Sequence, residues 1–175
     1  KPYYESAMVW KLHLKLKAQL EARGFEVMTT RVNIDTNLGV YERGTASKGC
    51  DVFLSLHSNA CGTESVDYPV VYRAYDNKNN VDALALKIAK KVGELMGTAQ
   101  AGRTATRKNS SGGEYYGVLR GARAVGTPYY MLIEHSFHTN TRMTTWLLDD
   151  ENLKRLAAAE AAVLAGHYGL KKIAD

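Results

Sequence analysis

The chain has 175 residues, 45% of them hydrophobic and 23% charged, and its formal net charge is +5. This composition is typical of one globular domain and excludes a disordered or collagen-like chain. No apolar run approaches the roughly 18 residues that a membrane-spanning helix needs, and the basic residues are too scattered to predict a nucleic-acid-binding surface.

The first half of the chain alternates between helical and extended patterns. Residues 3–23 predict a helix, because apolar residues recur at four-residue spacing at Met8, Leu12, Leu16 and Leu20. Gly24 is expected to end that helix. The remaining elements of this half are predicted strands at 25–31, 51–57 and 68–75, and one or two helical turns at 41–48.

The second half continues the alternation and indicates the fold class. It predicts a helix at 81–96, irregular chain at 102–117, a helical turn at 117–124, a strand at 128–137 and closing helices within 139–169. Strands that alternate with helices favour an α/β fold, in which a mostly parallel, twisted sheet is flanked by helices on both faces. We expect residues 1–175 to form a single domain.

Two cysteines flank the strand 51–57. An extended strand between Cys50 and Cys61 would hold the two residues beyond disulfide reach, so we expect two free thiols. The chain has no CxxC motif, and neither a zinc ribbon nor a redox motif is predicted.

Polar residues end two of the predicted strands. The apolar strand FLSLH ends at His57, and the strand MLIEHSF carries Glu134 among apolar residues. The carboxyl ends of strands in an open α/β sheet converge on one crevice, and the start of the first helix offers Glu5 as a third group. Histidine and glutamate ligands with an open position are typical of catalytic zinc, and a further glutamate can act as its base.

Each of these residues also has an ordinary structural explanation. His57 could hydrogen-bond the backbone at a strand end, and Glu5 could simply favour the positive end of a helix dipole. Glu134 could form a buried ion pair with an arginine such as Arg120. The nearby His135 and His138 are expected to be exposed or to support the site.

In the order in which Glu5, the His57 strand and the Glu134 strand follow one another, the chain resembles the zinc-dependent N-acetylmuramoyl-L-alanine amidases of bacterial autolysins and phage endolysins. The resemblance extends from Glu5 to about Gly169, and its most specific strings are SLHSNA and IEHSFHTN. It implies a sheet-centred α/β fold with the active site at the carboxyl ends of the strands. It also implies Zn²⁺ as the cofactor, Glu5 and His57 as metal ligands and Glu134 as the catalytic carboxylate.

The sequence departs from this family at its start. Such amidases begin with a strand that ends in a glycine-histidine pair, and that histidine is the remaining zinc ligand. Here the sequence starts at Lys1, four residues before Glu5, so the first strand and the first metal histidine are missing from it. We expect upstream residues to supply them. Replacement of that ligand by His135 or His138 is the alternative.

The resemblance implies hydrolysis of the amide between N-acetylmuramic acid and L-alanine in peptidoglycan, by a monomer acting outside the cell or on the cell wall. Asn59, Arg43 and Arg120 are candidates to bind substrate or support the site, and the loop NSSGGE could flank the substrate groove. Two other functions stay open, a catalytically inactive wall-binding module of the same fold and a zinc exopeptidase.

Overall fold

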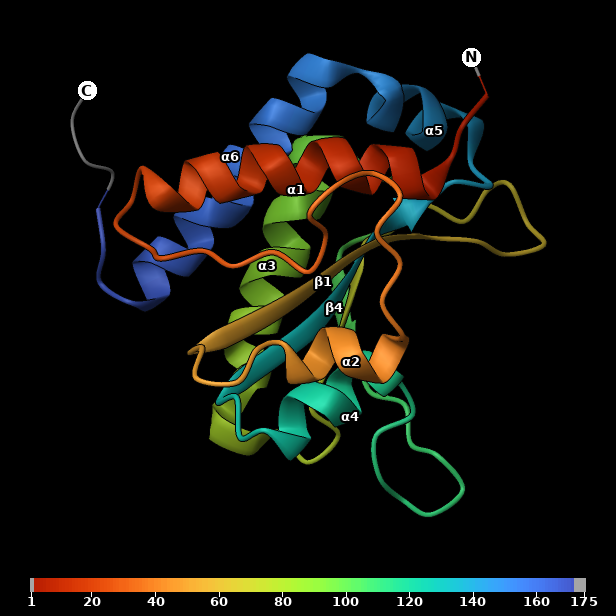
Figure 1. Ribbon diagram of the computed structural model, residues 1–175. Helices are drawn as coiled ribbons and strands as arrows, with labels where there is room; N and C mark the ends of the chain where they lie inside the picture. Colours follow the sequence, from red (N-terminus) through yellow and green to blue (C-terminus); the bar gives the residue numbers. More distant parts are fainter. Residues whose placement is uncertain (1, 172–175) are drawn as a thin grey trace.

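The computed structural model describes residues 2–171, which form an α/β structure around one four-stranded sheet (Figure 1). The strands are β1 (Val52–Asn59), β2 (Val70–Arg73), β3 (Arg103–Ala105) and β4 (Tyr129–Phe137). The helices are α1 (Glu5–Glu21), α2 (Val40–Thr45), the 3-10 turn η1 (Lys78–Asn80), α3 (Val81–Met96), α4 (Gly117–Ala124), α5 (Thr141–Leu148) and α6 (Asp150–His167).

The sheet has the strand order β1-β4-β2-β3. β1 pairs with β4 in parallel and β2 with β3 in parallel, while β2 and β4 run antiparallel. The prediction of a mostly parallel sheet is therefore confirmed. The short strand β3 was not predicted, because three residues are too few to show a hydrophobic period.

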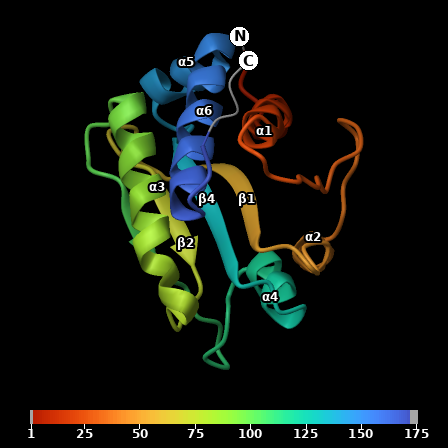
Figure 2. The same cartoon turned by 90° about the vertical axis from the view of Figure 1, so that its left-hand side faces the viewer.

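Helices cover both faces of the sheet, as predicted. α3 and α6 pack on one face, and α4 packs against β4 on the other face with α2 beside it. α1 lies along α6 and also contacts β1. Figure 2 shows these layers from the side, with the short helices α2 and α4 covering only the lower part of their face. The upper part of that face is where β1 and β4 end.

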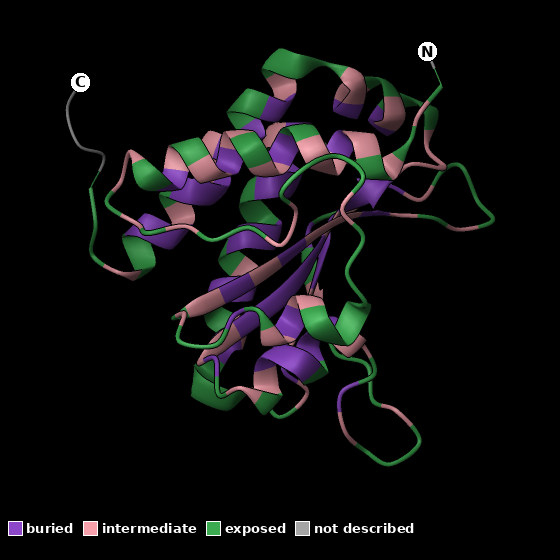
Figure 3. Ribbon diagram, in the orientation of Figure 1, coloured by how far each residue is buried: buried purple, intermediate pink, exposed green. Residues whose placement is uncertain are grey.

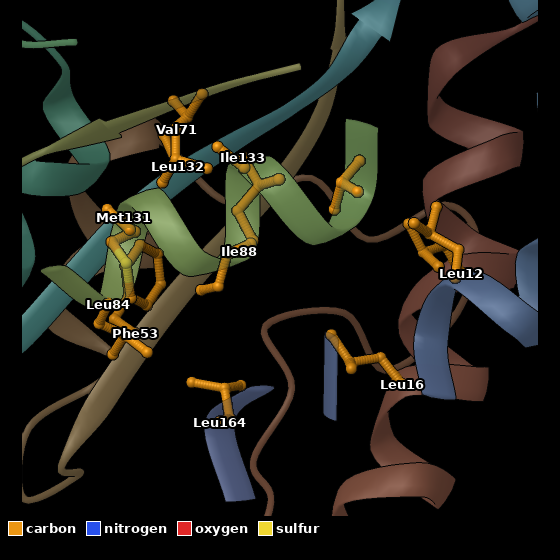
Figure 4. Close-up of a cluster of buried hydrophobic side chains, with 14 of the residues drawn as sticks. Leu12, Leu16, Phe53, Val71, Leu84, Ile88, Met131, Leu132, Ile133 and Leu164 are labelled. Atoms are coloured by element: carbon orange, nitrogen blue, oxygen red, sulfur yellow. The ribbon is translucent and has the colours of Figure 1, made fainter. Parts of the chain in front are cut away.

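The core lies between the sheet and the helices α1, α3 and α6. The predicted stripe of α1 is confirmed, because Met8, Leu12, Leu16 and Leu20 are all buried. In Figure 3 buried residues colour the strands and the inner sides of the helices. Figure 4 shows Ile88 of α3 close to Ile133 of β4, and both belong to the same buried cluster.

The prediction of a strand at residues 25–31 is wrong. This segment has no strand pairing within the described residues, and β1 is the edge strand on that side of the sheet. The segment is held by other contacts: the Phe25 amide donates to the carbonyl of Leu20, and the Phe25 ring packs edge-on against Tyr168. Its apolar residues resemble a strand in sequence, but strand formation requires a hydrogen-bonding partner.

Two glycines allow α2 and α4 to pack closely. A Cβ atom on Gly121 would lie 2.2 Å from the carbonyl oxygen of Tyr41, and one on Gly44 would lie 2.1 Å from the carbonyl oxygen of Val118. Such distances are far inside van der Waals contact, so only glycine fits at this crossing. In Figure 2 this crossing lies at the lower end of the sheet, away from the carboxyl ends of β1 and β4.

Candidate active site

The sheet register brings His57 and Glu134 side by side. His57 of β1 is paired with Glu134 of β4, and paired residues of neighbouring strands project from the same face. Just beyond them the register shifts, so that Asn59 pairs with Phe137. Ser136 at this β-bulge has a φ angle of +56° and donates from its hydroxyl to the buried carboxylate of Asp67. The bulge marks the end of regular pairing at the carboxyl end of both strands.

Glu5 reaches His57 from the first turn of α1. Its Oε1 atom lies 3.0 Å from Nδ1 of His57 and accepts the backbone N–H of Ser58 at 3.1 Å. The other ring nitrogen of His57 lies 2.8 Å from the hydroxyl of Ser55. Burial alone would raise the pKa of Glu5, but the hydrogen bonds from His57 and Ser58 outweigh it and hold that pKa below its usual value. The structure thus joins two of the predicted residues directly.

Glu134 is half-buried and poorly paired. Its Oε2 atom is buried and has no hydrogen-bond partner among residues 2–171. Burial raises the pKa of Glu134, His57 opposes this shift and Glu5 adds to it. No ion pair joins Glu134 to Arg120 within the described residues, so the structural explanation offered for Glu134 does not hold. An unpaired carboxylate beside a histidine is free to exchange a proton with a bound molecule.

His135 lies on the opposite face of the sheet from Glu134 and is completely buried. Its Nδ1 atom donates to the backbone carbonyl of His57 at 2.8 Å, and its Nε2 atom bonds the carboxylate of Glu160 on α6. Of the two expectations for His135, exposure is wrong, whereas support of the site agrees with its bond to the backbone of His57. Both ring nitrogens are used, so His135 is not free to replace a metal ligand. Successive strand residues point to opposite faces, which separates His135 from Glu134. Burial would lower the pKa of His135, but Glu160 outweighs it and raises that pKa.

Glu160 was not singled out in the sequence. The available signal was a single carboxylate in the small-residue run LAAAEAAVLAG of α6, where a charged side chain needs a buried partner.

Tyr3 and His138 border the site beside Glu5. The Tyr3 hydroxyl lies 2.6 Å from Oγ of Ser58, which lies 2.9 Å from Nδ1 of His138. The two rings stack with centroids 5.4 Å apart. Burial raises the pKa of Tyr3 to about 12, so its hydroxyl keeps its proton at neutral pH. His138 is half-exposed, as predicted, and sequence analysis did not single out Tyr3 or Ser58.

Three further candidates make local contacts. Asn59 accepts the N–H of Ala60 at 2.9 Å at the end of β1. Arg43 donates to the carbonyl of Leu38 and to the side chain of Asn37. Arg120 donates to the backbone carbonyls of Glu114 and Tyr115, which fastens the loop containing NSSGGE. The two arginines thus bind loop segments of the chain itself.

The pair of Glu5 and His57 fits part of a zinc site. Oε1 and Nδ1 are 3.0 Å apart, close to the about 3.3 Å that separates two ligand atoms of tetrahedral zinc with bonds of about 2.0–2.1 Å. Among residues 2–171, no three histidine, cysteine, aspartate or glutamate side chains gather as a metal site. Cys50 and Cys61 are free, as expected, and half-exposed. The donor atoms of Glu5 and His57 could therefore supply two ligands of a metal ion.

Comparison with solved structures shows the same fold in bacterial proteins, two of them amidases by name. The chain superposes on Cwp6 from Clostridium difficile with a TM-score of 0.81 and 23% identity, over 93% of this chain but only 25% of that one. On the catalytic domain of CwlV, an N-acetylmuramoyl-L-alanine amidase from Bacillus (Paenibacillus) polymyxa var. colistinus, the TM-score is 0.78 and the identity 22%, over 96% and 87% of the two chains. An N-acetylmuramoyl-L-alanine amidase from Clostridium difficile 630 gives a TM-score of 0.81 at 18% identity, over 95% and 85%.

These identities are low, so the likeness shows a shared fold. None of the curated proteins matches the chain in sequence. No helix among the described residues is both long and apolar enough to cross a membrane. The sequence profile of one family, described as N-acetylmuramoyl-L-alanine amidase, matches residues 1–165. By this match the chain belongs to the N-acetylmuramoyl-L-alanine amidase family.

Proposed function

We propose that this chain hydrolyses the amide bond between N-acetylmuramic acid and L-alanine in peptidoglycan, with zinc as cofactor. The observation that carries the proposal is the group at the ends of β1 and β4. There Glu5 bonds His57, and Glu134 projects beside His57 with a buried, unpaired oxygen atom. Family membership supports the same substrate, and a peptidoglycan amidase acts on the cell wall. We propose that it acts there as a monomer.

Glu5 and His57 are the proposed metal ligands, with a third ligand supplied from outside this group. Bound zinc would supply Lewis-acid polarisation of the scissile carbonyl. The hydroxyl of Ser55 lies 2.8 Å from Nε2 of His57 and orients the imidazole, while the N–H of Ser58 holds the Glu5 carboxylate. Such supporting hydrogen bonds fix ligand orientation in metal sites.

Glu134 is the proposed general base and acid. It would accept a proton from the attacking water and deliver that proton to the alanine nitrogen as the amide bond breaks. Its raised pKa favours this role, because a carboxylate that binds protons more readily is a stronger base. Asn59, Arg43 and Arg120 remain proposed substrate-binding or supporting residues.

The test is the variant Glu134→Gln, which keeps the size of the side chain but cannot carry the proton. We expect hydrolysis of purified cell walls, measured as newly released amino termini, to fall by a factor of about 10²–10⁴. Zinc content and wall sedimentation should remain those of the unmodified protein. The exposed Glu151→Gln on α6 is the control and should be fully active. If Glu134→Gln keeps a tenth of the activity, Glu134 is not the base.

The same assay separates the two other functions. A catalytically inactive wall-binding module would sediment with walls and release no amino termini, in wild type and variant alike. A zinc exopeptidase would release free amino acids from short peptides that lack muramic acid.

A further inference from the structure

One row of residues crosses the whole sheet on the face of the candidate active site. His57 of β1 pairs with Glu134 of β4, Glu134 pairs with Val70 of β2, and Val70 pairs with Arg103 of β3. Because paired residues project from the same face, the row places an exposed arginine on the same face as the catalytic pair. The only member between Glu134 and Arg103 is the apolar Val70.

Arg103 is held in place without using its hydrogen-bond donors. Its guanidinium carbon lies 3.7 Å from the centre of the Tyr68 ring, a stacked arrangement. Tyr68 in turn packs edge-on against the buried Phe137 of β4. Within residues 2–171 the Arg103 guanidinium makes no ion pair and no hydrogen bond, whereas Arg73, Arg123 and Arg142 each pair with an aspartate. Stacking leaves the N–H edge of a guanidinium free to bind a carboxylate with two hydrogen bonds.

Arg107 repeats the arrangement four residues later. Its guanidinium carbon lies 3.6 Å from the centre of the Tyr115 ring, and it too has no ion pair among the described residues. Tyr115 packs edge-on against Tyr116, and Tyr116 packs against Tyr72 of β2. The two arginines therefore form a cationic rim, defined here as Arg103 and Arg107, along the β3 side of the sheet.

We infer that this rim binds a carboxylate of the substrate's peptide, an assignment that rests on the proposed amidase function. Neighbouring strands are about 4.8 Å apart, so Arg103 lies two strand spacings, about 10 Å, from Glu134. An extended peptide advances about 3.3–3.6 Å per residue. A peptide that starts at the scissile amide beside Glu134 and runs across β2 reaches Arg103 with its second or third residue. The rim thus selects peptides that carry a negative charge at that position.

The test uses two synthetic muramyl tripeptides, one with free carboxylates on its second and third residues and one with carboxamides there. In Arg103→Gln we expect KM for the carboxylate substrate to rise about tenfold with kcat unchanged, because a bidentate charged pair is lost. For the carboxamide substrate KM should be the same in variant and wild type. Arg107→Gln should give a smaller rise with the same selectivity. The exposed Arg155→Gln on α6 is the matched control and should change neither value.

The rim assignment is overturned if Arg103→Gln leaves both KM values unchanged, or raises them equally for both substrates. If the wild-type protein cleaves neither substrate, the proposed function fails instead. Calorimetric titration of the same two peptides then tests whether the rim binds the carboxylate. Wild type should bind the carboxylate peptide about tenfold more tightly than Arg103→Gln does, and equal binding by the two proteins refutes the assignment.

Discussion

Removing the Glu160 carboxylate should destabilise the protein strongly, because it is the buried partner of His135. In the structure Glu160 and His135 are both completely buried and bond each other, and His135 bonds the backbone carbonyl of His57. Glu160→Ala leaves a buried imidazole without its partner. Breaking a buried ion pair from one side costs about 3–5 kcal/mol of unfolding free energy. Glu160→Gln can still hydrogen-bond a neutral imidazole, so it should lose less than half as much.

Urea unfolding at pH 6, followed by circular dichroism on protein treated with a chelator, measures this loss. Glu151→Ala, an exposed position on the same helix, is the control and should change the unfolding free energy by less than about 0.5 kcal/mol. If Glu160→Ala unfolds within about 1 kcal/mol of the unmodified protein, the pair does not hold α6 to the sheet and the reasoning is refuted.

The pH dependence of the same difference follows from His135. The pKa of His135 is raised in the folded state by Glu160. The contribution of His135 to the free energy of unfolding is therefore fully present below its unfolded-state pKa of about 6.5. It is lost as the pH rises through its folded-state pKa. The difference in unfolding free energy between the unmodified protein and Glu160→Ala should therefore become smaller as the pH is raised from 6. A gap that widens over this range would contradict the assigned charge state.

Four further substitutions test the core, the helix crossing and the proposed metal ligand His57. Leu16→Ala should lose about 2–5 kcal/mol of unfolding free energy in urea without altering zinc content, because Leu16 is buried in the core. Gly121→Ala should lower the thermal midpoint, since its Cβ would lie 2.2 Å from the carbonyl of Tyr41, whereas Gly166→Ala has open space and should gain up to about 1 kcal/mol in helix propensity. His57→Ala should lose both zinc, measured by elemental analysis, and wall hydrolysis; an active, zinc-replete variant would show that His57 is not a ligand.

Much of the architecture was predictable from local patterns. The four-residue spacing of Met8, Leu12, Leu16 and Leu20 predicts one buried face, and that face is buried. The apolar run of residues 128–137 predicts a strand, and β4 forms there. Hydrophobic periodicity and composition are properties of a single segment. A segment long enough for its pattern to repeat can therefore be assigned as helix or strand without knowledge of the fold.

The sequence-based predictions that were wrong or missing share one cause: each depends on a partner that is distant in the sequence. Residues 25–31 have strand-like composition but no strand pairs with them. An ion pair with Arg120 was one structural explanation for Glu134, yet Arg120 donates to the backbone carbonyls of Glu114 and Tyr115. β3 exists because β2 pairs with it, although its three residues carry no pattern of their own.

For the site, the sequence by itself determined the chemistry that is available: a histidine at one strand end, a carboxylate in another strand and a glutamate at a helix start. Only the tertiary structure decided their arrangement. The strand order β1-β4-β2-β3 pairs His57 with Glu134 and places Arg103 at the far end of the same row. The neighbouring His135 projects from the other face, where it bonds Glu160. Strand pairing is made by hydrogen bonds between segments far apart in the chain, and no local pattern specifies which two segments will meet.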